Sequence, residues 1–262
     1  MTEPLINWLR EACAGFVFNP EGVYQRTGMH PWPLRATDPE DLTRQLAQGG
    51  HLLPLPRESA ALANVIEVAL VDYLLERLAV LPDADGTRGA ERGYPDLEVS
   101  GDRFGGGHRA VDVKMARVKT KRKGDPTKTV SRITLFTGNT YFRHPELPLG
   151  GIRRPFGEYS EHLDIIGLYI FDEESKARVR SLELLVHEPW RIASRERSST
   201  TREYIGAVDD ITDLRAGLGV FATEAEFYEY WRTYPFKTPR MISRELDKLL
   251  RRSAAPTSTE PS

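Results

Sequence analysis

The chain has 262 residues, a formal net charge of −2 and 40% apolar residues. This length and apolar content are sufficient for one sizeable hydrophobic core, and they exclude a fibrous or largely disordered protein. The longest apolar runs, at 65–80 and 165–171, are too short or too often interrupted by charges to cross a bilayer, and the N-terminus lacks a secretory signal. We therefore expect a cytoplasmic protein.

The N-terminal part is expected to consist of helices separated by an irregular segment. Residues 4–15 carry apolar side chains at helical spacing, and Cys13 belongs to that apolar face. Since Cys13 is the only cysteine, internal disulfides and cysteine-rich zinc sites are excluded. Residues 20–55 are rich in proline, which prevents long regular elements, and residues 59–81 have the pattern of one long helix.

Short segments rich in β-branched and aromatic residues predict strands, and two further helices follow them. Thr223-Glu224-Ala225-Glu226 is a capping box that begins an aromatic helix, and a basic helix is expected from about Pro239 to Arg252. Residues 253–262 are expected to be disordered. The order of elements predicts an α/β (α+β) fold with a mixed central β-sheet flanked by helices. The predicted strands are 94–99, 110–115, 133–137, 165–171, 179–187 and 190–193.

Two acids and a lysine lie on the first two predicted strands. Asp96 follows Pro95, which is tolerated only at a strand start or edge, so Asp96 is expected near a strand end. Strand alternation places Asp112 and Lys114 on one face of the next strand. The glycines between 101 and 107 supply the reversal of a hairpin that brings both acids together. Such a set predicts a divalent-cation site, and Mg²⁺ suits its oxygen ligands.

The long helix supplies a third carboxylate. Glu67 shares a helical stripe with Val71, Leu74 and Leu78, so the spacing places a charge on an inward-facing surface. Each residue also has a simpler interpretation: a strand-end Asp often caps a turn, an Asp-x-Lys pair is often a surface salt bridge, and a lone Glu turns outward to water. Short motifs match by chance. The metal-site interpretation therefore depends on the whole set and on the residues that follow it.

Basic residues are concentrated directly after the second acid, and Asp125 is the only acid among them. An isolated charge run is usually a solvated loop, but beside a metal site it is equally consistent with a surface that follows phosphates. The basic residues are Lys114, Arg117, Lys119, Lys121, Arg122, Lys123, Lys128 and Arg132.

These motifs resemble the PD-(D/E)xK superfamily of nucleases, and the wider chain resembles the EcoRV family of type II restriction endonucleases. The resemblance covers roughly Ala63 to Tyr234 and implies a restriction-endonuclease-like core with DNA-recognition loops and a dimerisation subdomain. It implies one domain over 1–252, with a catalytic core at about 59–193, a recognition loop at about 194–206 and a C-terminal helical part at about 223–252. The further similar segments are 155–159, 166–169, 190–193, 205–206, 219–221 and 226–232.

The resemblance assigns roles residue by residue. Asp96 and Asp112 match the family's metal-binding acids, Lys114 its catalytic lysine and Glu67 its helix-borne acid. Segment 89–93 occupies the place of the loop that follows the minor groove, with Glu and Arg in place of glutamines. Segment 198–204 occupies the place of the major-groove recognition loop but departs from the family's glycine- and asparagine-containing sequence. The expected DNA-contacting residues are Glu91, Arg92, Lys119, Lys121, Ser198, Ser199, Thr200, Thr201, Arg202, Glu203 and Tyr204.

The implied function is Mg²⁺-dependent hydrolysis of both strands of a short palindromic site in double-stranded DNA, with 5′-phosphate, 3′-hydroxyl and blunt ends. A two-fold site is usually read by a two-fold protein, so we expect a homodimer, with the proline-rich region before Ser59, or its neighbouring segments, forming part of its interface. Arg202 prefers guanine and Glu203 accepts from cytosine, which indicates a G·C pair in the site. It is equally open that Arg202 binds phosphate and that Glu203 orients it.

Two other functions are compatible with parts of the pattern. A repair or recombination nuclease of the same superfamily would cut by DNA structure rather than sequence. A DNA-binding protein without catalysis would be expected to lack Asp96, Asp112 or Lys114, all of which are present. An enzyme acting on small phosphate esters would not need the basic segment or the polar loop at 198–204.

Overall fold

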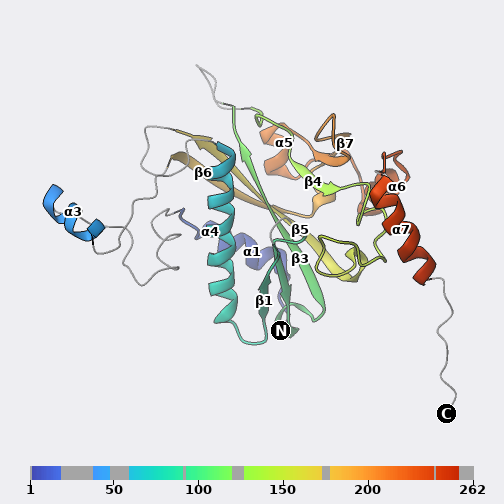
Figure 1. Ribbon diagram of the computed structural model, residues 1–262, viewed down its shortest axis with the longest axis horizontal. Helices are drawn as coiled ribbons and strands as arrows, with labels where there is room; N and C mark the ends of the chain where they lie inside the picture. The colour runs from blue at the N-terminus through green and yellow to red at the C-terminus, as the bar shows by residue number, and fades with distance from the viewer. Residues whose placement is uncertain are drawn as a thin grey trace, which may run out of the picture.

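The structure is a computed structural model that describes residues 2–18, 38–47, 59–90, 93–119, 127–172, 178–238 and 240–253. Its centre is a five-stranded sheet, seen in Figure 1. The strands of this sheet are β1 (Asp85–Arg88), β2 (Leu97–Ser100), β3 (His108–Arg117), β5 (Tyr159–Phe171) and β6 (Val179–His187). Their order is β1-β2-β3-β5-β6, and only β3 and β5 are parallel. The sheet is therefore mixed and flanked by helices, which confirms the expected fold class.

A second, three-stranded antiparallel sheet stands beside the first. It consists of β4 (Thr134–Thr137), β7 (Ala193–Arg197) and β8 (Tyr204–Ala207), in the order β4-β8-β7. The strand predicted at 190–193 is wrong, because Pro189 begins a short 3₁₀ turn, Pro189–Arg191, and β7 starts only at Ala193. Strands β1 and β8 were not predicted, since each is four residues long and contains a glycine.

The described helices include two, α3 and α5, that the sequence did not suggest. Helix α3 lies in the proline-rich region, where Pro39 takes the first helical position and Glu40 and Asp41 follow in the first turn, both favourable at a helix start. Helix α5 is short and is capped by Asp210, whose side chain accepts from the backbone N–H of Thr212 and Asp213. The helices are α1 (Leu5–Ala14), α3 (Pro39–Ala47), α4 (Ser59–Ala79), α5 (Ile211–Ala216), α6 (Glu224–Thr233) and α7 (Arg240–Ser253).

Helices α1 and α4 cover one face of the large sheet. Leu70 and Leu74 of α4 pack in one apolar cluster with Val111 and Val113 of β3. Cys13 lies buried in the same cluster, as expected from its place on the apolar face of α1. None of the helices formed by the described residues is both long and apolar enough to span a bilayer.

An aromatic core fills the space on the other side of the large sheet, where the small sheet and helices α5 and α6 lie (Figure 1). The fully buried residues of this core include Phe136 of β4, Phe156 in the turn before β5, and Phe227 and Trp231 of α6. The indole N–H of Trp231 donates to the carbonyl of Ser194 at 3.2 Å. The predicted capping box is present, since the hydroxyl of Thr223 accepts from the N–H of Glu226 at 3.1 Å. The same core contains Ala110 and Ala116 of β3 together with residues of β4 and β8.

Candidate active site

A glycine-rich hairpin sets the position of the two acids. Strands β2 and β3 pair antiparallel from Leu97↔Val111 to Ser100↔His108. Gly101, Gly105, Gly106 and Gly107 in the connection all have positive φ, a conformation that other residues rarely adopt. The hairpin brings Asp96, directly before β2, alongside β3, where the N–H of Val113 donates to its Oδ2 at 2.7 Å. The expected hairpin is therefore present, and it places Asp96 next to the strand that carries Asp112.

Asp96, Asp112 and Lys114 line one pocket of about 270 Å³. Asp112 is 4% exposed, and Lys114 donates a hydrogen bond from its Nζ to Asp112 Oδ2. The other wall comes from β4 and the end of the recognition loop, including Thr134 and Tyr204. The remaining lining residues are Gly93, Tyr94, Leu135, Phe136, Thr137, Tyr141 and Gly151.

The segment before β2 is held from both sides. The backbone of Tyr94 pairs with the segment 151–153, accepting from Arg153 N at 3.0 Å and donating to the carbonyl of Gly151 at 2.8 Å. Two residues past Asp96, the buried carboxylate of Glu98 accepts from Arg154 at 2.7 and 2.9 Å. Burial would raise the pKa of Glu98, but the guanidinium of Arg154 outweighs it and lowers the pKa. Asp96 is thus placed by a fixed backbone.

The carboxylate of Asp112 strongly affects the protonation of Asp96. Burial, and then the nearby carboxylate of Asp112, raise the pKa of Asp96 to about 9. For Lys114, burial alone would lower the pKa, but the carboxylates of Asp112, Asp96 and Asp164 outweigh it and raise the pKa above its ordinary value. Lys114 is therefore a charged ammonium at neutral pH. A buried pair of carboxylates that retains a proton offers an oxygen site at which a cation can replace that proton.

Asp164 is an acid near this site that the sequence analysis missed. It lies on β5, directly opposite Asp112 in the parallel register, and is 1% exposed. Within the described residues neither of its carboxylate oxygens has a hydrogen-bond partner. Burial, followed by the charge of Asp112, raises its pKa well above the ordinary value. The signal was present in the sequence as a lone acid between Leu163 and Ile165, but the predicted strand began after it.

Glu67 lies next to this pocket rather than in it. The half-buried side chain shares a second pocket, of about 460 Å³, with Asn64 and Arg88, and Asp96 lines both pockets. Burial raises the pKa of Glu67, and the nearby ammonium of Lys114 opposes that change. Among the described residues, no three His, Cys, Asp or Glu side chains are grouped closely enough to form a metal cage.

The donor set nevertheless fits Mg²⁺. This ion keeps several waters and is usually bound by one or two carboxylates together with phosphate oxygens of the substrate, so a cage of three protein ligands is not required. Asp96 and Asp112 provide two such carboxylates in a pocket open to solvent. The structure therefore brings together three of the four predicted catalytic residues, and Glu67 adjoins them through Asp96.

The predicted recognition loop forms the connection between β7 and β8. Its base is closed by the N–H of Ser198, which donates to the carbonyl of Tyr204 at 3.1 Å, and by an ion pair between Arg197 and Glu203 at 2.9 Å. The partner of Glu203 is thus Arg197, while Arg202 donates to the hydroxyl of Tyr204 at 3.0 Å. Thr200, Thr201 and Arg202 are exposed at the tip, and Ser199 is half-buried.

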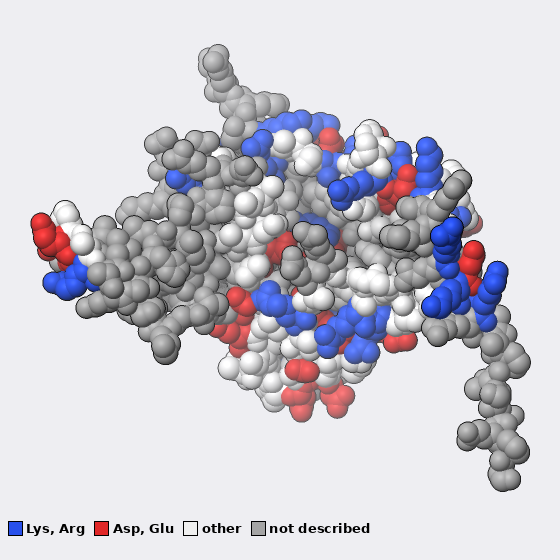
Figure 2. Space-filling model, in the orientation of Figure 1, with Lys and Arg blue, Asp and Glu red and all other residues white. Residues whose placement is uncertain are grey.

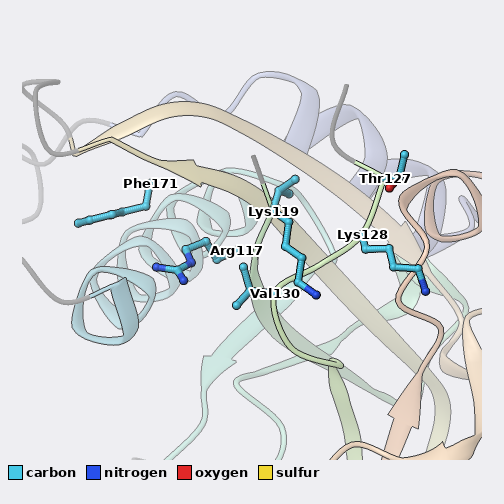
Figure 3. Close-up of a pocket in the computed structure, with 7 residues that line it drawn as sticks. Arg117, Lys119, Thr127, Lys128, Val130 and Phe171 are labelled. Atoms are coloured by element: carbon cyan, nitrogen blue, oxygen red, sulfur yellow. The ribbon is translucent and has the colours of Figure 1, made fainter. Parts of the chain in front are cut away.

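The loop is also tied to the pocket of the two aspartates. The hydroxyls of Ser198 and Thr134 lie 2.6 Å apart, and both Thr134 and Tyr204 line the pocket of the two aspartates. Of the other residues predicted to contact DNA, Glu91, Arg92 and Lys121 lie outside the described residues. Lys119 lines a separate groove at the end of β3, shown in Figure 3.

The mixed sheet, with Asp112 and Lys114 on β3 and Asp96 directly before β2, is the arrangement expected for a restriction-endonuclease-like fold. The sequence profile of the family described as Restriction endonuclease EcoRV matches residues 30–251 of the chain. The protein therefore belongs to the EcoRV family of restriction endonucleases. No match to the chain is found among curated proteins.

Proposed function

We propose that the protein is a type II restriction endonuclease that uses Mg²⁺ to hydrolyse both strands of a short palindromic site in double-stranded DNA. The observation that carries the proposal is the shared pocket of Asp96, Asp112 and Lys114 in a chain of this family. The active unit is a homodimer of cytoplasmic single-domain subunits spanning 1–252, because a two-fold protein matches a two-fold site. The part of the proline-rich region expected at the interface lies mainly outside the described residues.

Asp96 and Asp112 would hold the Mg²⁺, which when bound supplies a Lewis acid for the scissile phosphate and lowers the pKa of a water. Lys114 is charged and fixed to Asp112, so its role is to donate to the water or phosphate and to offset developing negative charge, rather than to act as the base. The water oxygen forms a bond to phosphorus and gives up a proton to solvent, while the bond from phosphorus to the 3′ oxygen breaks and that oxygen takes up a proton from solvent. A 5′-phosphate and a 3′-hydroxyl result.

Glu67 has a secondary role in this scheme. Glu67 lines the adjoining pocket together with Asn64 and Arg88. Among the described residues, Asp96 is the one that lines both this pocket and the pocket of the two aspartates. We assign Glu67 to holding a water, or a second cation, against Asp96. Its loss should therefore reduce the cleavage rate less than the loss of either aspartate.

The recognition loop would read the bases from the major groove. Arg202 is exposed at its tip, so its guanidinium is free to leave Tyr204 and donate to a guanine. Glu203 is already held by Arg197, so we assign it to the support of the loop rather than to a cytosine contact. Since the loop base also lines the catalytic pocket, base reading and cutting are adjacent in the fold.

Digestion of phage and plasmid DNA tests the proposal. The purified protein with Mg²⁺ should give discrete bands, and sequencing of their ends should show one short palindrome with blunt cuts and 5′-phosphates. A structure-specific nuclease would instead give no discrete bands on intact duplex DNA. Binding without any cutting would identify a catalytically silent DNA-binding protein, and either result would contradict the proposal.

A further inference from the structure

A short hydrogen bond joins the segment before Asp96 to β5. The hydroxyl of Tyr94, two residues before Asp96, lies 2.6 Å from Nδ1 of His162. Tyr94 is 5% exposed and also lines the pocket of the two aspartates. A polar group is costly to bury in an apolar core without a partner, so this contact is a specific one. Neither residue takes part in the proposed hydrolysis, and the bond therefore needs another explanation.

His162 is held in a fixed position by its surroundings. It pairs with Ala110 in the parallel register of β3 and β5. Its ring stacks on that of Phe156, with centroids 3.9 Å apart and planes 13° from parallel, and the backbone of Phe156 hydrogen-bonds the imidazole. Burial lowers the pKa of His162 to about 3, so the ring is neutral at pH 7 and keeps one nitrogen as an acceptor. The acceptor offered to Tyr94 is therefore fixed by the sheet and by the aromatic core.

Tyr94 transmits that fixed position to the segment before β2. Its ring stacks on Tyr141, with centroids 5.2 Å apart and planes 15° from parallel. Stacked rings can still slide over one another, and the hydroxyl is the directional contact that prevents this. Because Tyr94 and Asp96 are two residues apart, their Cα atoms are separated by at most roughly 7 Å. A shift of Tyr94 would thus move the Asp96 carboxylate relative to Asp112, which belongs to another strand.

We propose that Tyr94 and His162 are positioning residues, whose hydrogen bond holds the Asp96 carboxylate beside Asp112 in the arrangement that binds the cation. The inference rests on the proposed function, because it concerns the same cation. Loss of a partner that orients a metal ligand without touching the metal typically lowers metal affinity by about ten- to a hundredfold. A contribution to folding alone would instead leave cation affinity unchanged in a folded variant. The two roles are separated by measuring cation binding and stability on the same proteins.

The test compares variants that remove the hydrogen bond with one that removes a similar bond elsewhere. Tyr94→Phe removes the hydroxyl, His162→Leu removes the acceptor, and the double variant removes both. Tyr73→Phe is the matched control, because the hydroxyl of Tyr73 donates to the carbonyl of Ala12 at 3.1 Å between α4 and α1, outside the lining of the pocket. All these variants exchange neutral residues, so the surface charges, seen for one face in Figure 2, are the same in each.

Mn²⁺ binding to the purified protein without DNA is followed through the electron paramagnetic resonance signal of the free ion, and binding that is lost in Asp112→Asn is assigned to the pocket. Tyr94→Phe and His162→Leu should each weaken that binding by about tenfold. The double variant should bind no more weakly than either single one, since both changes remove the same contact. Tyr73→Phe should bind like the wild type. The Mg²⁺ concentration for half-maximal cleavage should rise in parallel, while the rate at saturating Mg²⁺ changes little.

Wild-type Mn²⁺ affinity in folded Tyr94→Phe would overturn the inference, and so would additive losses in the double variant or an equal loss in Tyr73→Phe. Urea unfolding shows which variants are folded. If Tyr94→Phe does not fold, His162→Gln, which keeps an acceptor, is compared with His162→Leu. Affinity retained with Gln supports the inference, and equal affinities contradict it. Because Mn²⁺ binding is measured without DNA, an absence of discrete cleavage bands would refute the proposed function and leave this test intact.

Discussion

Replacing Asp96 by Asn should abolish cleavage and at the same time make the metal-free protein more stable. Burial and the Asp112 carboxylate raise the pKa of Asp96 from an ordinary 3.8 to about 9. An acid with a raised pKa in the folded state stabilises the fold only while it is protonated. The wild type therefore loses stability as pH rises from about 4 towards 9, and Asn, which has no charge to lose, does not.

The size of the effect follows from this pKa difference. One pKa unit corresponds to about 1.4 kcal/mol, and pH 7 lies roughly three units above the ordinary value, which gives an upper bound of about 4 kcal/mol. The side-chain oxygen of Asn can still accept from the N–H of Val113, so that hydrogen bond is kept. Relaxation of the pocket and water entry reduce the gain, and we expect about 1–3 kcal/mol.

The assay is urea unfolding of both proteins in a chelator at several pH values. The free energies of unfolding should be equal near pH 4 and should separate in favour of Asp96→Asn up to about pH 9. Mg²⁺ should stabilise the wild type and leave the variant unchanged, since the cation replaces the proton between the aspartates. A variant less stable than the wild type at pH 7, or a difference independent of pH, would show that the buried charge of Asp96 does not destabilise the metal-free fold.

Three further outcomes are expected. Lys114→Met should reduce the cleavage rate by about a hundredfold or more, because the ammonium acts on the reacting phosphate. DNA affinity in a gel-shift assay should change little. Weaker binding at an unchanged cleavage rate would contradict this role of Lys114. Arg197→Ala removes the ion pair with Glu203, so it should lower the preference for the cognate site over sites with one changed base, measured on a set of short duplexes. Exchanging Arg197 and Glu203 should restore part of that preference. Burial raises the pKa of Cys13 to about 12, so a thiol reagent at pH 8 should modify it only in urea, and rapid labelling of the native protein would contradict its place in the core.

Local patterns predicted those parts of the fold that depend on short-range signals. The capping box at Thr223, the hairpin glycines and strand β6 at 179–187 were all predicted correctly from neighbouring residues. Strand β5 begins at Tyr159 rather than at 165. Its first residues are mostly polar, and they become part of the strand only because they pair with β3 in the folded sheet. Helix α3 shows that prolines interrupt long elements but also begin short ones.

The candidate site also has parts that local sequence predicts and parts that it does not. The spacing of Asp96, Asp112 and Lys114 was sufficient to predict that these residues lie together, because one hairpin determines their positions. Asp164 is brought opposite Asp112 by a parallel pairing between strands far apart in the sequence, which no local pattern reveals. The ion pair of Glu203 with Arg197 also depends on the closure of the loop. Tertiary pairing, rather than residue type, decided these features.

We propose that Asp96 and Asp112 hold the cation at which a phosphodiester is cut. The most direct measurement is digestion of plasmid DNA with Mg²⁺ by the wild type and by Asp112→Asn, with circular dichroism showing that both are folded. We predict discrete Mg²⁺-dependent fragments from the wild type and a loss of at least about a thousandfold in rate for the variant. Cleavage by folded Asp112→Asn at the wild-type rate would show that Asp112 does not hold the cation used in cutting.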